Sequence, residues 1–377
     1  MHLFIQTSLS VLCCATLLAV STQQAIGQAQ EKKLPCDELT EKALAKTSPE
    51  TVQSITAFTP AKVLQRKDPR YPSLAARDGK EGWVKISYVI DTEGKVKDPV
   101  VVDNGGSSRF KKAAMSAIKE WQYTPAIKNG KAVEQCHHSI QIDFSLLGQH
   151  GASRKFIVMY RKASQAMDEG DLAKAEKIVK RMKEKSGGNR YENAWLWALD
   201  ASIATETGDL RRELNSIDKA LASSKTHEDE YKTFKDDYLA SLYRRKFALH
   251  LEFNEFSTVL YTSRQIKTLE NGDDIIAPLL PYIQKVEDFI ASEDNIVVNR
   301  TLSESGRDFY YLARSKFGFS DINGKLDAVE VRCDSHREKF TVATDHIWSI
   351  PESWGDCQVL IEGKEGTEFK LVEVSKV

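Results

Sequence analysis

The most regular alternation in this 377-residue chain runs from Cys136 to Leu146, with the sequence CHHSIQIDFSL. On an extended strand, successive side chains point to opposite faces. One face then carries His138, Ile140, Ile142, Phe144 and Leu146, and the other carries His137, Ser139, Gln141, Asp143 and Ser145. This pattern predicts an antiparallel sheet that is covered by helices on one side and solvated on the other.

The segments before this strand predict the rest of a small α/β unit. Residues 83–90 alternate, with Val84, Ile86, Tyr88 and Ile90 on one face, and Asp91 to Gly94 form a turn before a second strand over 96–102. Residues 109–121 change to the helical period, with one apolar stripe that includes Phe110 and Ile118. Asn129-Gly130 predicts a further turn before the strand that begins at Cys136.

These elements carry a recognisable set of motifs in order. Pro69-Arg70-Tyr71-Pro72 comes first, followed by Gly82, the Asp91 to Gly94 turn, Phe110 with Ala113-Ala114, Trp121-Gln122-Tyr123-Thr124-Pro125, and Asn129-Gly130-Lys131. Taken together they resemble the C-terminal domain of the TonB family. The resemblance covers residues 60–147 and implies a helix–strand–strand–helix–strand (α-β-β-α-β) fold.

The resemblance also implies a function, which is the capture of a short peptide from an outer-membrane receptor. An unpaired strand edge accepts an extended peptide through its free backbone groups. The edge implied here is the last strand, with the candidate peptide-binding residues Ser139, Ile140, Gln141, Ile142, Asp143, Phe144 and Ser145, and with Arg70 and Tyr71 nearby. Asp68 stands where well-characterised members often have Gln, and this change predicts a different partner preference.

Two more parts follow along the chain. Residues 154–290 read as helical, and the Gly170-Asp171-Leu172 turn is echoed by Gly208-Asp209-Leu210, which predicts an α-solenoid of tetratricopeptide-like repeats or, alternatively, a plain helical bundle. Residues 295–377 return to period two and predict a small antiparallel β-sandwich or barrel. The fold class is therefore α+β and multidomain.

The N-terminal residues read as a targeting segment. Residues 3–20 are largely apolar and small residues follow near Ala25 to Ala29, so residues 1–29 are expected to be a signal peptide or, alternatively, a retained anchor, and residues 30–59 a linker. Export to the periplasm predicts disulfides Cys36–Cys136 and Cys333–Cys357, with free buried thiols as the alternative. An anchored chain would instead sit in the inner membrane and face the periplasm.

Composition narrows the function classes. Lys and Arg number 53 against 54 Asp and Glu, so no net basic charge points to nucleic acid. His137 and His138 are expected on opposite strand faces and cannot share one metal ion. We find no catalytic constellation, cofactor motif or metal site, and the chain is not expected to be an enzyme.

The leading hypothesis is a periplasmic TonB-like protein that binds an envelope partner by strand addition, with the helical repeats as a second protein-contact surface. The alternative is a membrane-anchored energy transducer coupled to the inner-membrane proton-driven motor proteins.

Overall fold

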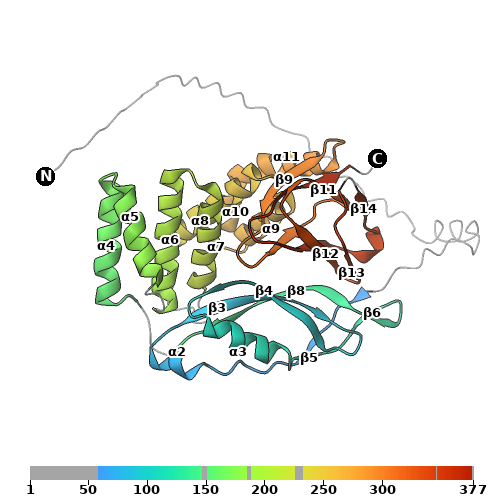
Figure 1. The fold of residues 1–377 in the computed structure, drawn as a ribbon, viewed down its shortest axis with the longest axis horizontal. Helices are drawn as coiled ribbons and strands as arrows, with labels where there is room; N and C mark the ends of the chain where they lie inside the picture. The colour runs from blue at the N-terminus through green and yellow to red at the C-terminus, as the bar shows by residue number, and fades with distance from the viewer. Residues whose placement is uncertain (1–57, 147–150, 185–187, 226–231, 345, 376–377) are drawn as a thin grey trace, which may run out of the picture. The chain divides into compact units, whose positions relative to one another are not determined.

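The computed structural model describes residues 58–146, 151–184, 188–225, 232–344 and 346–375 (Figure 1). The first part is built on a three-stranded antiparallel sheet with the order β4-β3-β8. Its strands are β3 (Gly82–Ile90), β4 (Val96–Gly105) and β8 (Gln135–Phe144), and its helices are α2 (Ser73–Arg77) and α3 (Arg109–Ile118). Two small accessory sheets have the orders β1-β6-β7 and β2-β5, from β1 (Phe58–Thr59), β2 (Val63–Gln65), β5 (Gln122–Tyr123), β6 (Ala126–Lys128) and β7 (Lys131–Val133).

The core of this first part forms as the alternation predicts. Val84, Ile86 and Ile90 of β3 are fully buried against the apolar stripe of α3, in which Phe110 and Ile118 are also fully buried. The helix ends at Ile118 rather than at the expected Trp121, and Trp121 donates its indole N–H to the carbonyl oxygen of Lys67, 2.9 Å away.

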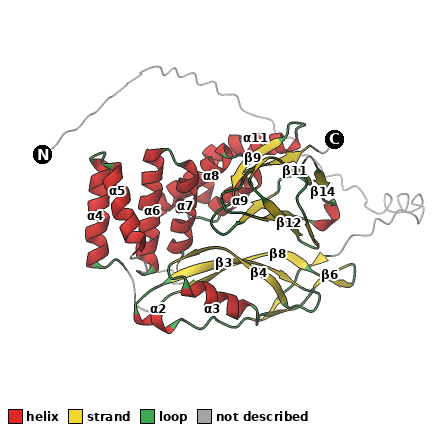
Figure 2. Cartoon of the chain, viewed as in Figure 1, coloured by secondary structure: helices red, strands yellow, loops and turns green. Residues whose placement is uncertain are grey.

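The second part is helical (Figure 2). Its helices are α4 (Arg154–Asp168), α5 (Leu172–Glu184), α6 (Arg190–Thr207), α7 (Leu210–Ser224), α8 (Asp236–Glu252), α9 (Phe256–Lys267), α10 (Gly272–Ile276), η1 (Ala277–Leu279) and α11 (Leu280–Ala291). Helix pairs meet at Gly170-Asp171, Gly208-Asp209 and Asn254-Glu255, where Gly170, Gly208 and Asn254 adopt the left-handed φ that ends a helix. The sequence therefore located the Gly170 and Gly208 turns correctly, whereas the tetratricopeptide-like solenoid stays a prediction.

The third part is a pair of four-stranded antiparallel sheets with the orders β10-β15-β12-β13 and β14-β11-β16-β9. Its elements are β9 (Ile296–Thr301), β10 (Arg307–Tyr311), β11 (Lys316–Asn323), β12 (Leu326–Cys333), β13 (Arg337–Phe340), β14 (Ile347–Ser349), η2 (Glu352–Trp354), β15 (Cys357–Gly363) and β16 (Glu368–Val374). The predicted Cys333–Cys357 disulfide joins β12 to β15 and is confirmed. The sequence missed β11 and β14.

The helical part and the β-sandwich share one hydrophobic core, which runs from α6 through α11 into both sheets. Polar contacts add to this joint. Arg314 is buried and donates to the carbonyl oxygens of Ile290 and Phe289 at the end of α11, at 2.9 and 2.6 Å. Buried Glu255 receives hydrogen bonds from His250 and Arg300, which outweigh the effect of burial and lower its pKa to about 2.

Glu373 on β16 is fully buried beside this joint. It accepts hydrogen bonds from the Tyr310 hydroxyl at 2.7 Å and from the backbone N–H groups of Ala313 and Arg314 at 2.7 and 2.6 Å. Burial nevertheless dominates and raises the pKa of Glu373 to about 7.

This raised pKa predicts a pH dependence of stability. The folded protein holds the Glu373 proton between the ordinary carboxyl pKa of 4.5 and about 7, so the stabilisation from this group falls as pH rises through that window. We expect Glu373→Gln, which keeps the shape and removes the titration, to lack this loss. The difference in unfolding free energy between parent and variant should change by about 3 kcal/mol from pH 5 to pH 8, measured by denaturant titration. A constant difference across that range would contradict the assignment.

Candidate functional site

Strand β8 forms one edge of the β4-β3-β8 sheet. It pairs with β3 along its length, with Ile140 opposite Ile86 and Ile142 opposite Val84. Within the described residues no strand pairs with its other edge. The backbone N–H and C=O groups of β8 that point away from β3 are therefore not paired with another described strand.

One face of β8 packs into the core as predicted. Ile142 and Phe144 are buried, and the Phe144 ring stacks on Phe110 with 4.4 Å between the ring centroids. Tyr71 packs edge-on against Phe144 at 5.8 Å, and its hydroxyl donates to the carbonyl oxygen of Lys80 at 2.5 Å. Burial raises the pKa of Tyr71 to about 12, so this hydroxyl remains a donor. Tyr71 thus packs against Phe144 near the end of β8, on the core side of the sheet.

The other face of β8 is only partly solvated: Ser139 and Ser145 are exposed, but the prediction of a solvated face was wrong for Gln141 and Asp143. Gln141 donates to the carbonyl oxygen of Ala222 at 3.0 Å, and to Asp143 at 2.7 Å. Arg190, at the start of α6, pairs with Asp143 at 2.9 Å and also donates to the Ala222 carbonyl oxygen at 3.0 Å. Gln141 and Asp143, two of the side chains that were expected to face a partner peptide, are therefore engaged with the helical part.

The same face of β3 is sealed along its length. Trp83 is 1% exposed and donates its indole N–H to the hydroxyl of Ser223 at 2.9 Å. Ser87, also 1% exposed, accepts from Gln358 of β15 at 3.1 Å and from Arg332 of β12 at 3.5 Å. The sheet is thus covered by α3 on one face and by α7 with the β-sandwich on the other.

The beginning of β8 is held by the β-sandwich. His137 lies 3.8 Å from Asp334, while His138 stacks on Tyr88 with 5.4 Å between ring centroids, so the two imidazoles point to opposite faces as predicted. Burial lowers the pKa of His138 to about 4. Cys136 is a buried thiol, and Cys36, its predicted disulfide partner, lies outside the described residues. The described residues hold no group of three His, Cys, Asp or Glu side chains suited to a metal ion.

The structure leaves the accessible part of the predicted site near the middle and end of the strand. Ser139 and Ser145 are exposed, and Ile140 is half-buried. Arg70 is exposed one residue before Tyr71, and Asp68 is exposed two residues earlier. The exposed residues of the predicted site are thus Ser139, Ser145 and Arg70, and no described strand pairs with the outer edge of β8.

Comparison with known proteins bears on this first part. The family model described as Gram-negative bacterial TonB protein C-terminal matches residues 67–146. Protein TonB of Vibrio cholerae is 34% identical over 98 residues, which are 26% of this chain and 40% of that protein. Residues 67–146 are a TonB C-terminal domain. Protein tonB2 of Pseudomonas aeruginosa is 35% identical over 83 residues, which are 22% of this chain and 30% of that protein. The chain therefore spans well under half the length of these relatives.

Solved structures of TonB C-terminal domains cover the same region. That of Pseudomonas aeruginosa is 26% identical and covers 24% of this chain and 92% of its own, with a TM-score of 0.23. The TonB2 protein of Vibrio anguillarum is 40% identical and covers 26% and 94%, with a TM-score of 0.20. Both scores are below 0.5, so the assignment rests on the sequence matches. Among the described helices, none combines the length and the apolar character that a membrane span needs.

A groove of about 530 Å³ separates β4 of the TonB C-terminal domain from β12, β13 and β15 of the sandwich. Its cations are paired inside the chain: Arg332 with Glu330 at 3.0 Å, Lys339 with Glu362 at 2.7 Å, and Arg337 with Asp98. Within each pair the two charges cancel, so the groove is not a charged ligand site. It is part of the interface between the TonB C-terminal domain and the β-sandwich.

Sequence reasoning missed the residues that cover the TonB C-terminal domain. Arg190, Arg332 and Gln358 carry no motif, and each acts on a strand more than 40 residues away, so no local spacing marks them. Glu81 belongs to the same joint, because it accepts from the backbone N–H groups of Arg190 at 2.9 Å and Leu146 at 2.5 Å.

We expect Arg190→Met to loosen this joint. The change removes the buried guanidinium from the partly buried carboxylate of Asp143, and breaking a buried ion pair from one side costs roughly 3 kcal/mol. Denaturant unfolding should show this loss, and hydrogen exchange should show faster exchange at the end of β8. Arg181→Met, at an exposed position of α5, is the matched control and should change stability by less than about 0.5 kcal/mol. Equal effects of the two substitutions would contradict the role given to Arg190.

Proposed function

We propose that this chain is a periplasmic TonB-like protein that binds an extended peptide of an outer-membrane or other envelope transport partner by strand addition. One observation carries the proposal: β8 ends the sheet order, and no described strand occupies its outer edge. The membership of residues 67–146 in the TonB C-terminal family supports it.

The contacts at β8 bear on how such a peptide would be recognised. Gln141 and Asp143 contact the helical part, and Ile142 and Phe144 lie in the core, so these four side chains are already engaged. Main-chain hydrogen bonds along the edge therefore supply most of the binding. Specificity comes from the polar groups beside the edge, which are Ser139, Ser145 and Arg70.

The helical part serves in this proposal as a second protein-contact surface. It contacts the TonB C-terminal domain through Arg190 and Ser223, so a partner bound at β8 would lie close to α6 and α7. This arrangement supports a function in which two surfaces of one body contact the same envelope assembly.

The alternative is a membrane-anchored TonB-type energy transducer coupled to the inner-membrane proton-driven motor proteins. The names of the relatives, Protein TonB and Protein tonB2, and the apolar residues 3–20 favour it. The predicted signal peptide or anchor, residues 1–29, lies outside the described residues.

Site-specific crosslinking tests the edge. A photo-crosslinking phenylalanine analogue replaces exposed Ser139 in the full chain, and the matched control carries it at exposed Lys112 on α3. After irradiation in cells, peptide mapping should find an extended segment of one envelope protein joined to position 139 and not to position 112. Backbone amides along the outer edge of β8 should then be protected from exchange when that peptide is added. Equal crosslinking at both positions, or no added protection, would overturn strand addition at β8.

Intact-mass analysis separates the two functions. The periplasmic protein should have lost about 29 residues and should remain in the soluble fraction after membranes are washed with carbonate. A full-length chain that stays with the inner membrane and crosslinks to motor proteins would favour the energy transducer.

A further inference from the structure

The α4–α5 helix pair forms one end of the helical part. Helix α4 packs against α5 and α6, and no described element lies on its outer side (Figure 1). The outer side of α4 is thus the surface at one end of the helical part. It differs from the rest of the molecule in its excess of positive charge.

The two helices carry a strong charge imbalance in a nearly neutral chain. Residues 154–184 contain nine Lys or Arg and five Asp or Glu, while the whole chain has 53 and 54. Because α4 and α5 are antiparallel, the start of α4 lies beside the end of α5. The acidic residues Asp168, Glu169 and Asp171 gather at the turn. The opposite end, called the basic end here, consists of Arg154, Lys155, Arg161, Lys162, Lys177, Lys180 and Arg181.

The charges of the basic end are not neutralised within the described part of the chain. All seven side chains are exposed, and none of them has a carboxylate at ion-pair distance there. Other lysines of the same helices are paired: Lys174 with Glu169 at 3.7 Å, and Lys183 with Asp200 at 2.7 Å. Seven like charges without counter-ions among the described residues favour an external anionic partner.

Two exposed aliphatic side chains lie between these cations. Ile157 is 38% exposed and Val158 is 48% exposed. Residues 154, 157, 158 and 161 share one face of a helix, so the aliphatic pair lies between Arg154 and Arg161, with Lys155 and Lys162 at its sides. The outer face of α4 is therefore amphipathic, with an apolar centre and a cationic rim.

We propose that the basic end binds an anionic phospholipid surface. A membrane interface offers both partners that this face needs, since negative headgroups pair with the cations and the acyl boundary receives Ile157 and Val158. An acidic polypeptide satisfies the charges, but a single helix at the end of a layer presents a ridge rather than a groove that would grip a peptide. A second copy of the chain is disfavoured because two identical cationic faces repel.

Vesicle co-sedimentation of the full chain tests this proposal. The probes are phosphatidylcholine vesicles with and without phosphatidylglycerol. Each basic side chain near an anionic surface contributes roughly fivefold to binding, so the variant Lys155→Glu, Arg161→Glu, Lys162→Glu should bind the anionic vesicles more than about tenfold more weakly. High salt, which shortens the screening length from about 10 Å to about 3 Å, should release the parent protein to a similar degree.

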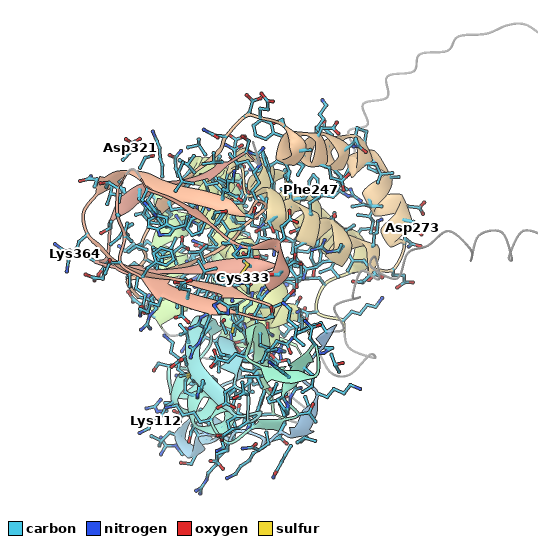
Figure 3. All side chains as sticks on the ribbon, turned by 90° about the vertical axis from the view of Figure 1, so that its right-hand side faces the viewer. Lys112, Phe247, Asp273, Asp321, Cys333 and Lys364 are labelled. Carbon is cyan, nitrogen blue, oxygen red and sulfur yellow. A yellow bond between two sulfur atoms is a disulfide. The ribbon has the colours of Figure 1, made fainter. Side chains whose placement is uncertain are left out.

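The matched control reverses three lysines elsewhere: Lys112→Glu, Lys267→Glu and Lys364→Glu. All three are exposed and lie outside α4 and α5; Figure 3 labels Lys112 and Lys364 on separate parts of the molecule. This variant has the same net charge as the first one and should bind like the parent. Circular dichroism should show the same helix content in all three proteins.

Several results would overturn the proposal. They are equal binding to neutral and anionic vesicles, equal weakening in the two triple variants, and binding of soluble polyglutamate without binding of anionic vesicles. The comparison of triple variants does not depend on residues 1–29, which are the same in every protein tested. It is also independent of peptide capture at β8, because none of the substituted residues lies on that strand.

Discussion

Burial of the second face of the β4-β3-β8 sheet is the constraint on which the rest of the structure depends. This face carries polar side chains at Ser87, Gln141 and Asp143, and polar groups that leave water need hydrogen-bond partners. The chain supplies them from a distance, through Arg190 of α6 and through Arg332 and Gln358 of the sandwich. Hydrogen bonds and ion pairs thereby join helix α6 and the β-sandwich to this one sheet.

This cover changes what a TonB C-terminal domain presents to its surroundings. A sheet with one solvated face offers that face and its edges to partners, whereas here most of that face is covered and no described strand pairs with the outer edge of β8. Recognition at such an edge relies on backbone groups, which are similar in every extended peptide. In the function proposed above, selectivity would then depend on the exposed residues Ser139 and Arg70 and on the neighbouring helices.

The helical part and the β-sandwich form one unit in the structure, although the sequence periodicity suggests two domains. The change from helical to alternating pattern near residue 295 suggests separate domains, yet α6 to α11 and the two sheets share one core. Arg314 and Glu255 reinforce this joint, since each connects a helix to the sandwich. In a joint of this kind the charged groups are buried with their partners, and this is why the pKa of Glu255 is low while that of Glu373, which has fewer charged neighbours, is high.

The sequence by itself determined the local elements and the family of residues 67–146, because strand alternation, helical stripes and turn residues are short-range signals. It placed the β3–β4 hairpin, α3, β8, the helix-pair turns and the Cys333–Cys357 disulfide, and it missed β11, where Gly318 interrupts a short aromatic run. The tertiary structure alone decided which face of the sheet is covered and which edge is left open. The hydrogen bond from Arg332 to Ser87 spans 245 residues, and the alternation of Ser, Gln and Asp is the same whether water or a distant arginine faces them. A pattern of polarity records that a side chain needs a polar partner, and only the folded chain settles where that partner comes from.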